Sequence, residues 1–337
     1  SICYGCRINK TYNSFTKSDI NAFKKLEVSM AETEIVKKLI DINGEQCVSE
    51  SEAMSRHTTF RIGGPARVFV SPDNIDKIIN TIELLKKEEQ EYFILGNGSN
   101  LLVADEGYNG IVVSTENLKE LNIEKEDGDM TYIYAQAGVM LSRAAVLASE
   151  SSLTGFEFAG GIPGSIGGAV SMNAGAYGGE IKDVIVSADV LMEDGSVVKM
   201  TNKELELSYR NSIIQKKNLV VLSAEFALKK GKKEEILAKM KDFSTRRRDK
   251  QPLEYASAGS TFKRPEGYFA GKLVDDAGLR GYRVGNVMVS EKHCGFVVNV
   301  GGGTCEEAKA VITHVREEVE KKFGVILEME VRKLGWS

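Results

Sequence analysis

Residues 159–178 read AGGIPGSIGGAVSMNAGAYG, and seven of these twenty residues are glycine. Glycine loses more backbone entropy on folding than any other residue, so a plain connector has no use for so many. Close approach of the backbone to a large ligand accounts for them, and tight turns packing two layers are the alternative. A lipase-type nucleophile elbow is excluded, because Pro163 rather than glycine stands two positions before Ser165.

A second glycine-rich loop precedes the first in the chain. Residues 96–100 read GNGSN and follow a predicted strand, so successive backbone N–H groups are free to face a pyrophosphate. The loop is no Rossmann fingerprint, because the third glycine is missing and the following residues predict strand and turn instead of a helix. An ordinary hairpin turn is the alternative for this loop taken alone. Together the two loops make a dinucleotide the candidate ligand.

Hydrophobic periodicity around the loops predicts mixed α and β structure. Apolar residues recur at helical spacing over residues 30–40, 71–85, 141–149, 236–243 and 304–319. Ser71-Pro72-Asp73 is expected to open the second helix, and Thr304 with Glu307 predicts a capping box for the last. Alternating or short apolar runs predict strands at residues 67–70, 92–95, 111–114, 131–136, 185–192, 197–200, 218–228, 295–300 and 325–334. This mixture is typical of an α+β protein.

Composition bounds the function. The chain has 337 residues, 42% of them apolar, and a formal net charge of −4, which gives no electrostatic reason to expect nucleic acid or an acidic membrane as partner. Five cysteines and three histidines form no complete zinc set and suit a reducing compartment. No apolar run is long enough to span a membrane. These features predict a soluble cytoplasmic protein without a metal.

The chain length and the changes of pattern predict several units. Residues 1–29 are polar and non-periodic, and Met30 opens a helical pattern, so 1–29 are expected to be a non-native or disordered extension. Three domains are then expected at residues 30–116, 117–248 and 249–337. The last boundary follows a helix that ends in the triple arginine 246–248, which is expected to be a solvated helix end.

Six motifs occur in one order along the chain. They are HTTFRIGGPA from 57, LGNGSNLLV from 95, AGGIPGSIGGAVSMNAGAYG from 159, YRNS from 209, AGSTFKRP from 258 and LEMEVR from 327. The series closely resembles the UDP-N-acetylenolpyruvoylglucosamine reductase (UDP-N-acetylmuramate dehydrogenase, MurB) family over about residues 30 to 335. Residues 1–29 match nothing in that family.

The resemblance implies a fold and an activity. The fold is a two-subdomain FAD-binding fold of the vanillyl-alcohol-oxidase (PCMH) type, followed by a smaller C-terminal α/β substrate domain. The activity is that of an oxidoreductase, a flavoprotein with non-covalent FAD, which uses NADPH to reduce UDP-N-acetylglucosamine-enolpyruvate to UDP-N-acetylmuramate in peptidoglycan synthesis. The resemblance assigns both glycine-rich loops to FAD binding. The cofactor-binding residues so implied are Gly96, Asn97, Gly98, Ser99, Asn100, Gly160, Gly161, Pro163, Gly164, Gly167, Gly168 and Asn173.

The resemblance also implies three catalytic residues, each at its own motif position: Arg210 in YRNS, Ser260 in AGST, and Glu330 as the second glutamate of LEMEVR. A fixed guanidinium suits the negative charge that develops when hydride adds to the enolpyruvyl group. From the residues alone, Arg210 could be a surface arginine and Ser260 a turn residue. Alternation places Glu330 and Glu328 on one strand face, and only the motif selects Glu330.

Substrate contacts are expected from Tyr209, beside Arg210, and from cations near Ser260 that can hold a diphosphate. Lys263 and Arg264 are favoured by that closeness over Lys272, Arg280, Arg283 and Lys292. Only 50 residues separate Arg210 from Ser260, so the chain resembles the family's short form, without an inserted tyrosine loop. The enzyme is expected to be a monomer or a weak oligomer.

Two other functions fit parts of the sequence. An oxygen-using flavin oxidase of the same fold often tethers its flavin through histidine, and only His57 lies near the predicted FAD region. A non-catalytic flavin or nucleotide-sugar-binding protein has no use for the three implied catalytic residues together. His293 beside Cys294 lacks a third orienting group and is interpreted as structural.

Overall fold

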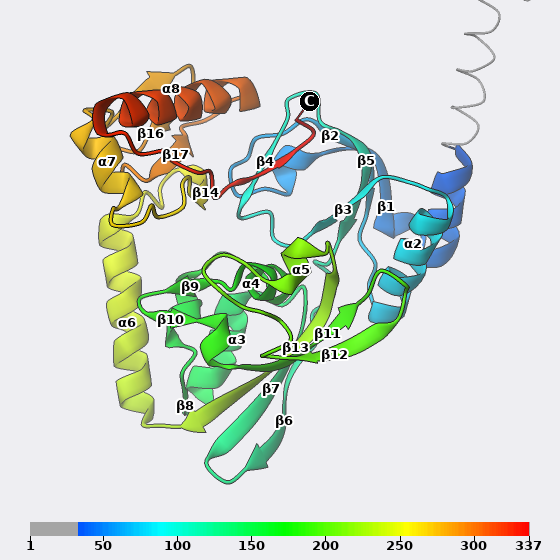
Figure 1. Ribbon diagram of the computed structural model, residues 1–337. Coiled ribbons are helices and arrows are strands. Elements are labelled where there is room, and N and C mark those ends of the chain that lie inside the picture. The colour runs from blue at the N-terminus through cyan, green and yellow to red at the C-terminus, as the bar shows by residue number, and fades with distance from the viewer. Residues whose placement is uncertain (1–32, 337) are drawn as a thin grey trace, which may run out of the picture.

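A computed structural model describes residues 33–336, and the expectation for residues 1–29 lies outside them. The described chain forms three sheet-based units, with one long helix, α6, running along the side between the second and the third (Figure 1). Their sheets lie within residues 48–114, 121–230 and 256–299. No helix of the described residues is long and apolar enough to cross a membrane.

The first unit is a four-stranded sheet of order β1-β2-β5-β3. Its outer pair β1/β2 is antiparallel, whereas β2/β5 and β3/β5 are parallel. The predicted start of helix α2 at residues 71–73 is wrong, because the helix begins after its N-cap residue Asn74. The Asn74 side chain accepts from Lys77 N, one of the N–H groups in the first turn that has no partner within the helix. The elements are a helix over 33–43, β1 (Val48–Ala53), β2 (Pro65–Val70), α2 (Ile75–Lys87), β3 (Tyr92–Leu95) and β5 (Tyr108–Ser114).

The second unit is an antiparallel sheet of order β12-β11-β13-β7-β6 with helices α3 and α4 against it. Their apolar faces form one buried cluster that includes Ile133, Phe226, Ala144 and Val170. The elements are β6 (Leu121–Asp127), β7 (Met130–Gln136), α3 (Leu141–Glu150), β8 (Leu153–Thr154), α4 (Ile166–Met172), β11 (Ile185–Leu191), β12 (Val197–Thr201), α5 (Ile213–Lys216) and β13 (Val220–Lys230).

The third unit is a sheet of order β14-β17-β16-β15 covered by α7 and α8. The capping box predicted for the last helix is confirmed, because Thr304 Oγ1 accepts from Glu307 N and Glu307 accepts from Thr304 N. The elements are α6 (Lys233–Lys250), β14 (Ala256–Ser260), α7 (Ala270–Asp276), β15 (Arg283–Val284), β16 (Val287–Val289), β17 (Phe296–Asn299) and α8 (Cys305–Phe323).

The chain end returns to the first unit. Strand β18 (Arg332–Leu334) pairs in parallel with β4 (Leu101–Val103), which directly follows the 96–100 loop. The predicted closing strand 325–334 is therefore too long. Residues 325–331 make only one bridge, Met329 to Phe262, because they connect two units and lie in neither sheet.

The third unit is anchored to the first by packing and by polar contacts. Phe60 and Leu102 of the first unit lie in the hydrophobic core of the third. Asp105 accepts from the backbone N–H groups of Cys305 (2.7 Å) and Glu306 (2.9 Å), at the N-terminus of α8, where a carboxylate also complements the helix dipole. Asn299 donates to the Phe60 carbonyl (3.1 Å). These contacts join the third unit to the first.

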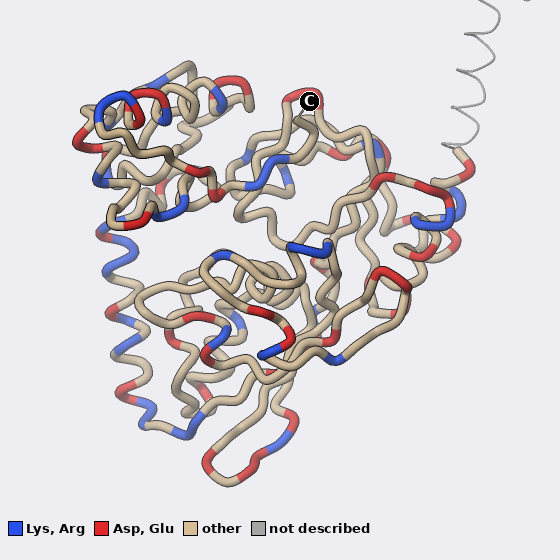
Figure 2. The backbone as a smooth tube through the Cα atoms, viewed as in Figure 1, with Lys and Arg blue, Asp and Glu red and all other residues tan. Residues whose placement is uncertain are grey.

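Charges of both signs are interspersed over the molecule. Figure 2 shows acidic and basic positions interspersed along α6, whereas the β6–β7 hairpin is mostly acidic. The charged residues of the hairpin are Glu124, Lys125, Glu126, Asp127 and Asp129. Over the whole chain the two signs nearly balance, with a net charge of −4.

Candidate active site

A tight turn at residues 208–211 presents Arg210. Ser208 and Asn211 exchange two backbone hydrogen bonds of 3.1 Å, with Tyr209 and Arg210 between them. Arg210 has a φ of 52°, a left-handed conformation that costs an L-residue other than glycine about 1–2 kcal/mol. The strain is retained at a residue that points into a pocket, as strained residues at functional sites often do.

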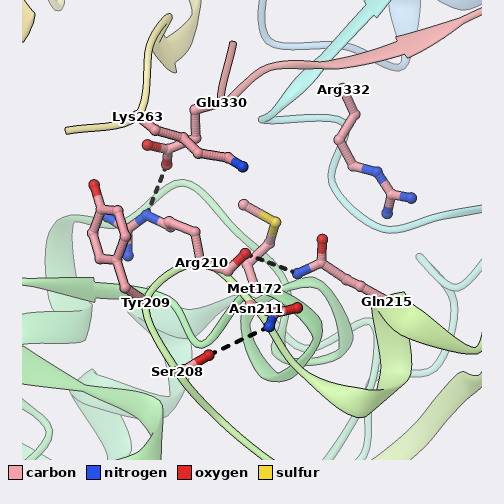
Figure 3. A pocket seen from close by; sticks show the side chains of 9 residues that line it. All are labelled: Met172, Ser208, Tyr209, Arg210, Asn211, Gln215, Lys263, Glu330 and Arg332. Carbon is pink, nitrogen blue, oxygen red and sulfur yellow. Dashed lines mark hydrogen bonds and ion pairs between the residues drawn. The ribbon is translucent and has the colours of Figure 1, made fainter. Parts of the chain in front are cut away.

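Arg210 meets Glu330 across 120 residues of sequence. Arg210 Nε donates to Glu330 Oε1 at 2.7 Å (Figure 3). Arg210 Nη2 donates to the Gly175 carbonyl at 3.3 Å. The Glu330 side chain is only 12% exposed. Burial raises the pKa of Glu330 above its ordinary value, although the guanidinium of Arg210 acts in the opposite direction. Two of the three predicted catalytic residues are thus in direct contact.

The pair lies in a pocket of about 460 Å³ between the second and third units. Three cations face this space: Arg210, Lys263 and Arg332. Such a lining suits an anionic ligand. The full lining is Met172, Ser208, Tyr209, Arg210, Asn211, Gln215, Lys263, Glu330 and Arg332.

The third predicted catalytic residue, Ser260, lies at the exposed end of β14 and does not line this pocket. It is joined to the pair through the backbone, because the carbonyl of the next residue, Thr261, accepts from Glu330 N at 2.9 Å. Gly259, directly before it, has a φ of 78°. Ser260 therefore directly precedes the residue whose carbonyl is hydrogen-bonded to Glu330.

The predicted substrate residues also lie together. The Tyr209 hydroxyl accepts from Arg264 N at 3.3 Å, and the Tyr209 ring lies 5.2 Å from Arg210 Cζ. Lys263 Nζ lies 3.0 Å from the exposed Glu328 carboxylate. The Arg264 guanidinium lies over the ring of Phe269 at 4.0 Å and does not line the pocket.

Arg332 and Gln215 are pocket residues that sequence reasoning missed. Burial lowers the pKa of Arg332, whose guanidinium has no ion-pair partner among residues 33–336. The signal for Arg332 was present, because it is the last letter of the LEMEVR motif. Gln215 has no motif signal at all, and only the folded backbone brings its amide to the carbonyl of Arg210.

The two glycine loops lie against each other. Asn97 Nδ2 donates to the Pro163 carbonyl at 2.8 Å, and a Cβ on Gly96 would lie 2.6 Å from Ser165 Oγ. Gly98 has a φ of 59°, and a Cβ there would lie 1.9 Å from the His57 carbonyl. Gly98 therefore admits glycine alone, whereas a side chain at Gly96 would displace the Ser165 hydroxyl. The backbones can therefore approach each other, or a ligand, more closely than side chains would allow.

The remaining predicted cofactor residues divide into two groups. Gly164 and Gly168 have no atom closer than 3.6 Å to an added Cβ, whereas Gly160 and Gly167 pack on neighbouring helices and strands. Ser99 Oγ lies 3.9 Å from the Cβ position of Gly164. Two asparagines brace protein segments instead: Asn100 donates to the Glu330 carbonyl (3.1 Å), and the fully buried Asn173 donates to Ser208 and Glu180.

The end of α6 differs from the predicted solvated triple arginine. Arg246 is exposed and pairs with Asp242, as expected of a solvated helix end. Arg247 instead turns toward the long glycine loop, where its Nε and Nη1 lie 3.1 Å from the Cβ position of Gly161. Its Nε is buried without a hydrogen-bond partner in the protein. Consecutive residues of a helix point in different directions, so Arg246 faces solvent while Arg247 faces the glycine loop. A run of three identical residues gives no sign of which side chain takes which direction.

The donor set fits a dinucleotide pyrophosphate. Two buried polar atoms near the loops, Ser165 Oγ and Arg247 Nε, lack partners in the protein, and such groups are costly unless a ligand or water satisfies them. Both can donate a hydrogen bond to an anion. Glycine backbone without Cβ atoms stands beside both of them. The predicted cofactor region thus offers the groups that a bound pyrophosphate requires.

Family models match two parts of the chain. Residues 66–201 match the model described as FAD binding domain, and residues 251–334 match the model described as UDP-N-acetylenolpyruvoylglucosamine reductase, C-terminal domain. The predicted α+β fold, an FAD-binding domain followed by a C-terminal domain, is confirmed.

Individual relatives match nearly the whole chain. A UDP-N-acetylenolpyruvoylglucosamine reductase of Lachnoclostridium phytofermentans is 52% identical over 301 residues, which are 89% of this chain and 97% of the relative. One from Caldanaerobacter subterraneus subsp. tengcongensis is 48% identical, covering 89% and 98%. The crystal structure of the enzyme (MurB) from Thermus caldophilus superposes with a TM-score of 0.73 at 32% identity, covering 85% of this chain and 98% of that one.

Proposed function

The chain belongs to the UDP-N-acetylenolpyruvoylglucosamine reductase family, and on that premise we propose that this FAD-binding oxidoreductase uses NADPH to reduce UDP-N-acetylglucosamine-enolpyruvate to UDP-N-acetylmuramate. The single observation that carries the proposal is the 2.7 Å contact of Arg210 with Glu330 in a pocket lined by further cations. The product is a precursor of peptidoglycan, so the proposed cellular role is cell-wall biogenesis. The proposed location is the cytoplasm, as a monomer or weak oligomer.

FAD, when bound, would supply the hydride chemistry that couples NADPH to the nucleotide sugar. Ser165 Oγ and Arg247 Nε would hold its pyrophosphate, together with the glycine backbone of both loops. His57, the histidine that a covalent flavin would need, is engaged elsewhere. Its Nε2 lies 3.0 Å from Glu52, and its ring stacks on Phe69.

Arg210 holds the enolpyruvyl carboxylate, where negative charge grows as hydride arrives. Glu330 accepts from Nε and the Gly175 carbonyl accepts from Nη2, so the plane of the guanidinium is oriented while Nη1 has no partner of its own among residues 33–336. Because Glu330 is paired and buried, the guanidinium cannot swing to solvent. The charge-stabilising group is therefore in place before substrate arrives, which is the condition for electrostatic catalysis.

Ser260 donates the proton that the substrate carbon needs after hydride addition. A serine hydroxyl is a poor acid in water, so its proton transfer depends on a desolvated setting that the bound substrate completes. The backbone link from Thr261 to Glu330 sets the distance between acid and guanidinium. Lys263 and Arg332 face the same space and would hold the remaining anionic groups of the nucleotide sugar.

The test is anaerobic. The purified yellow protein is bleached with NADPH and then mixed with UDP-N-acetylglucosamine-enolpyruvate. Rapid return of the oxidised flavin spectrum, with UDP-N-acetylmuramate formed, is the expected result. Flavin that stays bleached with the nucleotide sugar, yet recovers when oxygen is admitted, would overturn the proposal in favour of an oxidase.

A further inference from the structure

The turn that carries Arg210 is held at both ends by side-chain amides. Gln215 Nε2 donates to the Arg210 carbonyl at 3.2 Å and to the Ser171 carbonyl at 2.7 Å (Figure 3). Asn173 Nδ2 donates to the Ser208 carbonyl at 3.1 Å. The amides tie the turn to the end of α4, and both lie within the second unit.

The turn needs such restraint because of its backbone conformation. Arg210 has a φ of 52° at the second central position of a two-residue turn, a position that ordinarily takes glycine or asparagine. An arginine freed from restraint relaxes toward negative φ, where most L-residues lie. That rotation redirects the Cα–Cβ bond and carries the guanidinium away from Glu330.

We propose that Gln215 is a positioning residue: its amide holds the Arg210 carbonyl, and thereby the left-handed backbone that directs the guanidinium at Glu330 and the substrate carboxylate. The inference rests on the proposed function and deepens it. Gln215 is itself fixed, because it lies on α5, whose N-cap Ser212 donates to the same Ser171 carbonyl at 2.6 Å. The chain of contacts runs from α4 through Gln215 to Arg210.

A direct role of Gln215 in substrate binding is disfavoured by its hydrogen-bond inventory. A glutamine amide has two N–H donors, and both are used by the carbonyls of Ser171 and Arg210. Only Oε1 remains, and an acceptor is a poor partner for an anionic ligand. Its substitution should therefore act on turnover through Arg210.

Gln215→Met tests the proposal, because methionine has nearly the same length and no donor. The expected result is an FAD content like that of wild type and a kcat lowered about 10- to 100-fold, as a misplaced catalytic group produces. Lys216→Met is the matched control, since Lys216 is the next residue on α5, is exposed and pairs with Glu206. The control should keep wild-type kcat.

A double-mutant cycle separates positioning from general structural support. In an Arg210→Met background, adding Gln215→Met should leave the rate of flavin reoxidation by substrate unchanged, because the group that Gln215 positions is already gone. Multiplying effects in the double mutant, or a wild-type kcat for Gln215→Met, would overturn the inference. If Gln215→Met lacks flavin, Gln215→Asn replaces it, with an amide too short to span both carbonyls and the same expected cycle. If the wild-type protein does not reduce the nucleotide sugar, the proposed function itself is wrong. That result differs from a wild-type kcat in Gln215→Met, which overturns only the positioning role.

Discussion

Ser260 is a residue whose role depends on one hydroxyl. Ser260→Ala removes the proposed acid without touching the Arg210–Glu330 contact. Flavin bleaching by NADPH should keep its wild-type rate, whereas reoxidation by the nucleotide sugar should slow about 10²- to 10⁴-fold, the usual range for a lost general acid. Stopped-flow absorbance measures both half-reactions. Ser257→Ala, on the same strand, is the control, and a normal reoxidation rate in Ser260→Ala would contradict the assignment.

Glu330 should make stability depend on pH. Burial raises the pKa of Glu330 above its ordinary 4.5. A carboxyl whose pKa rises on folding favours the folded state while protonated and loses that contribution as pH increases through the raised value. The unfolding temperature of Glu330→Gln, minus that of wild type, should therefore increase from about pH 4.5 upward and then level off. Thermal unfolding across pH measures it. A difference between the two unfolding temperatures that stays flat across this pH range would refute the prediction.

Arg247 should contribute to cofactor affinity. Its buried Nε lacks a protein partner beside Gly161. A charge-assisted hydrogen bond is worth about 1.5–3 kcal/mol, so Arg247→Met should raise the FAD dissociation constant roughly 10- to 100-fold. Fluorescence titration of apoprotein with FAD measures this without any substrate. Arg246→Met, on the exposed side of the same helix, should bind FAD as wild type does, and equal affinities for the two variants would contradict the role.

At the scale of elements, β18 is short but joins two units. Leu334 is 6% exposed and packs with Val103 in the core of the first unit. Leu334→Ala should lower the free energy of unfolding by about 2–5 kcal/mol, as buried leucine truncations do. It should also lower kcat, because Glu330 and Arg332 lie on the same segment. Urea unfolding with parallel assays tests this. Lys333→Ala, an exposed neighbour, should do little, and an unfolding midpoint like that of wild type in Leu334→Ala would refute it.

Elements with a strong hydrophobic pattern could be predicted from sequence, and those formed by long-range contacts could not. The capping box at Thr304 follows from local chemistry. Strand β6 was missed because its residues after Leu121 are exposed, so no apolar alternation marks it. Helix α4 lies hidden inside the glycine-rich segment, where glycine lowers helix propensity but tertiary packing overrides it.

The site shows the same division. The motifs selected Arg210 and Glu330, and the structure brings them into contact. A motif cannot predict whether Asn173 contacts the cofactor or supports the Arg210 turn. That role depends on which backbone carbonyl lies beside the Asn173 amide in the folded chain, and here it is the Ser208 carbonyl. Gln215 likewise has no motif signal, because only the folded backbone brings its amide to the Arg210 carbonyl.

At the scale of the whole molecule, Asp105 ties the third unit to the first. Asp105→Ala removes the acceptor for two N–H groups at the start of α8. The free energy of unfolding should fall by about 0.5–2 kcal/mol, the usual effect of removing a helix cap. The Michaelis constant for the nucleotide sugar should rise, because the third unit carries the pocket residue Lys263. Calorimetry and steady-state kinetics measure the two effects. Glu106→Ala, at the neighbouring position, is the control, and unchanged values in Asp105→Ala would show that packing alone suffices.

The return of the chain end to β4 has a consequence for biosynthesis. A nascent chain emerges from the ribosome with Arg210 well before Glu330, and domains fold in the order in which they are made. The guanidinium therefore lacks its carboxylate partner until Glu330 itself has been synthesised, 120 residues after Arg210, together with the neighbouring strand β18 that pairs with β4. A chain terminated early contains both glycine loops but not the carboxylate that orients Arg210. The oriented Arg210 therefore forms later in synthesis than the two glycine loops.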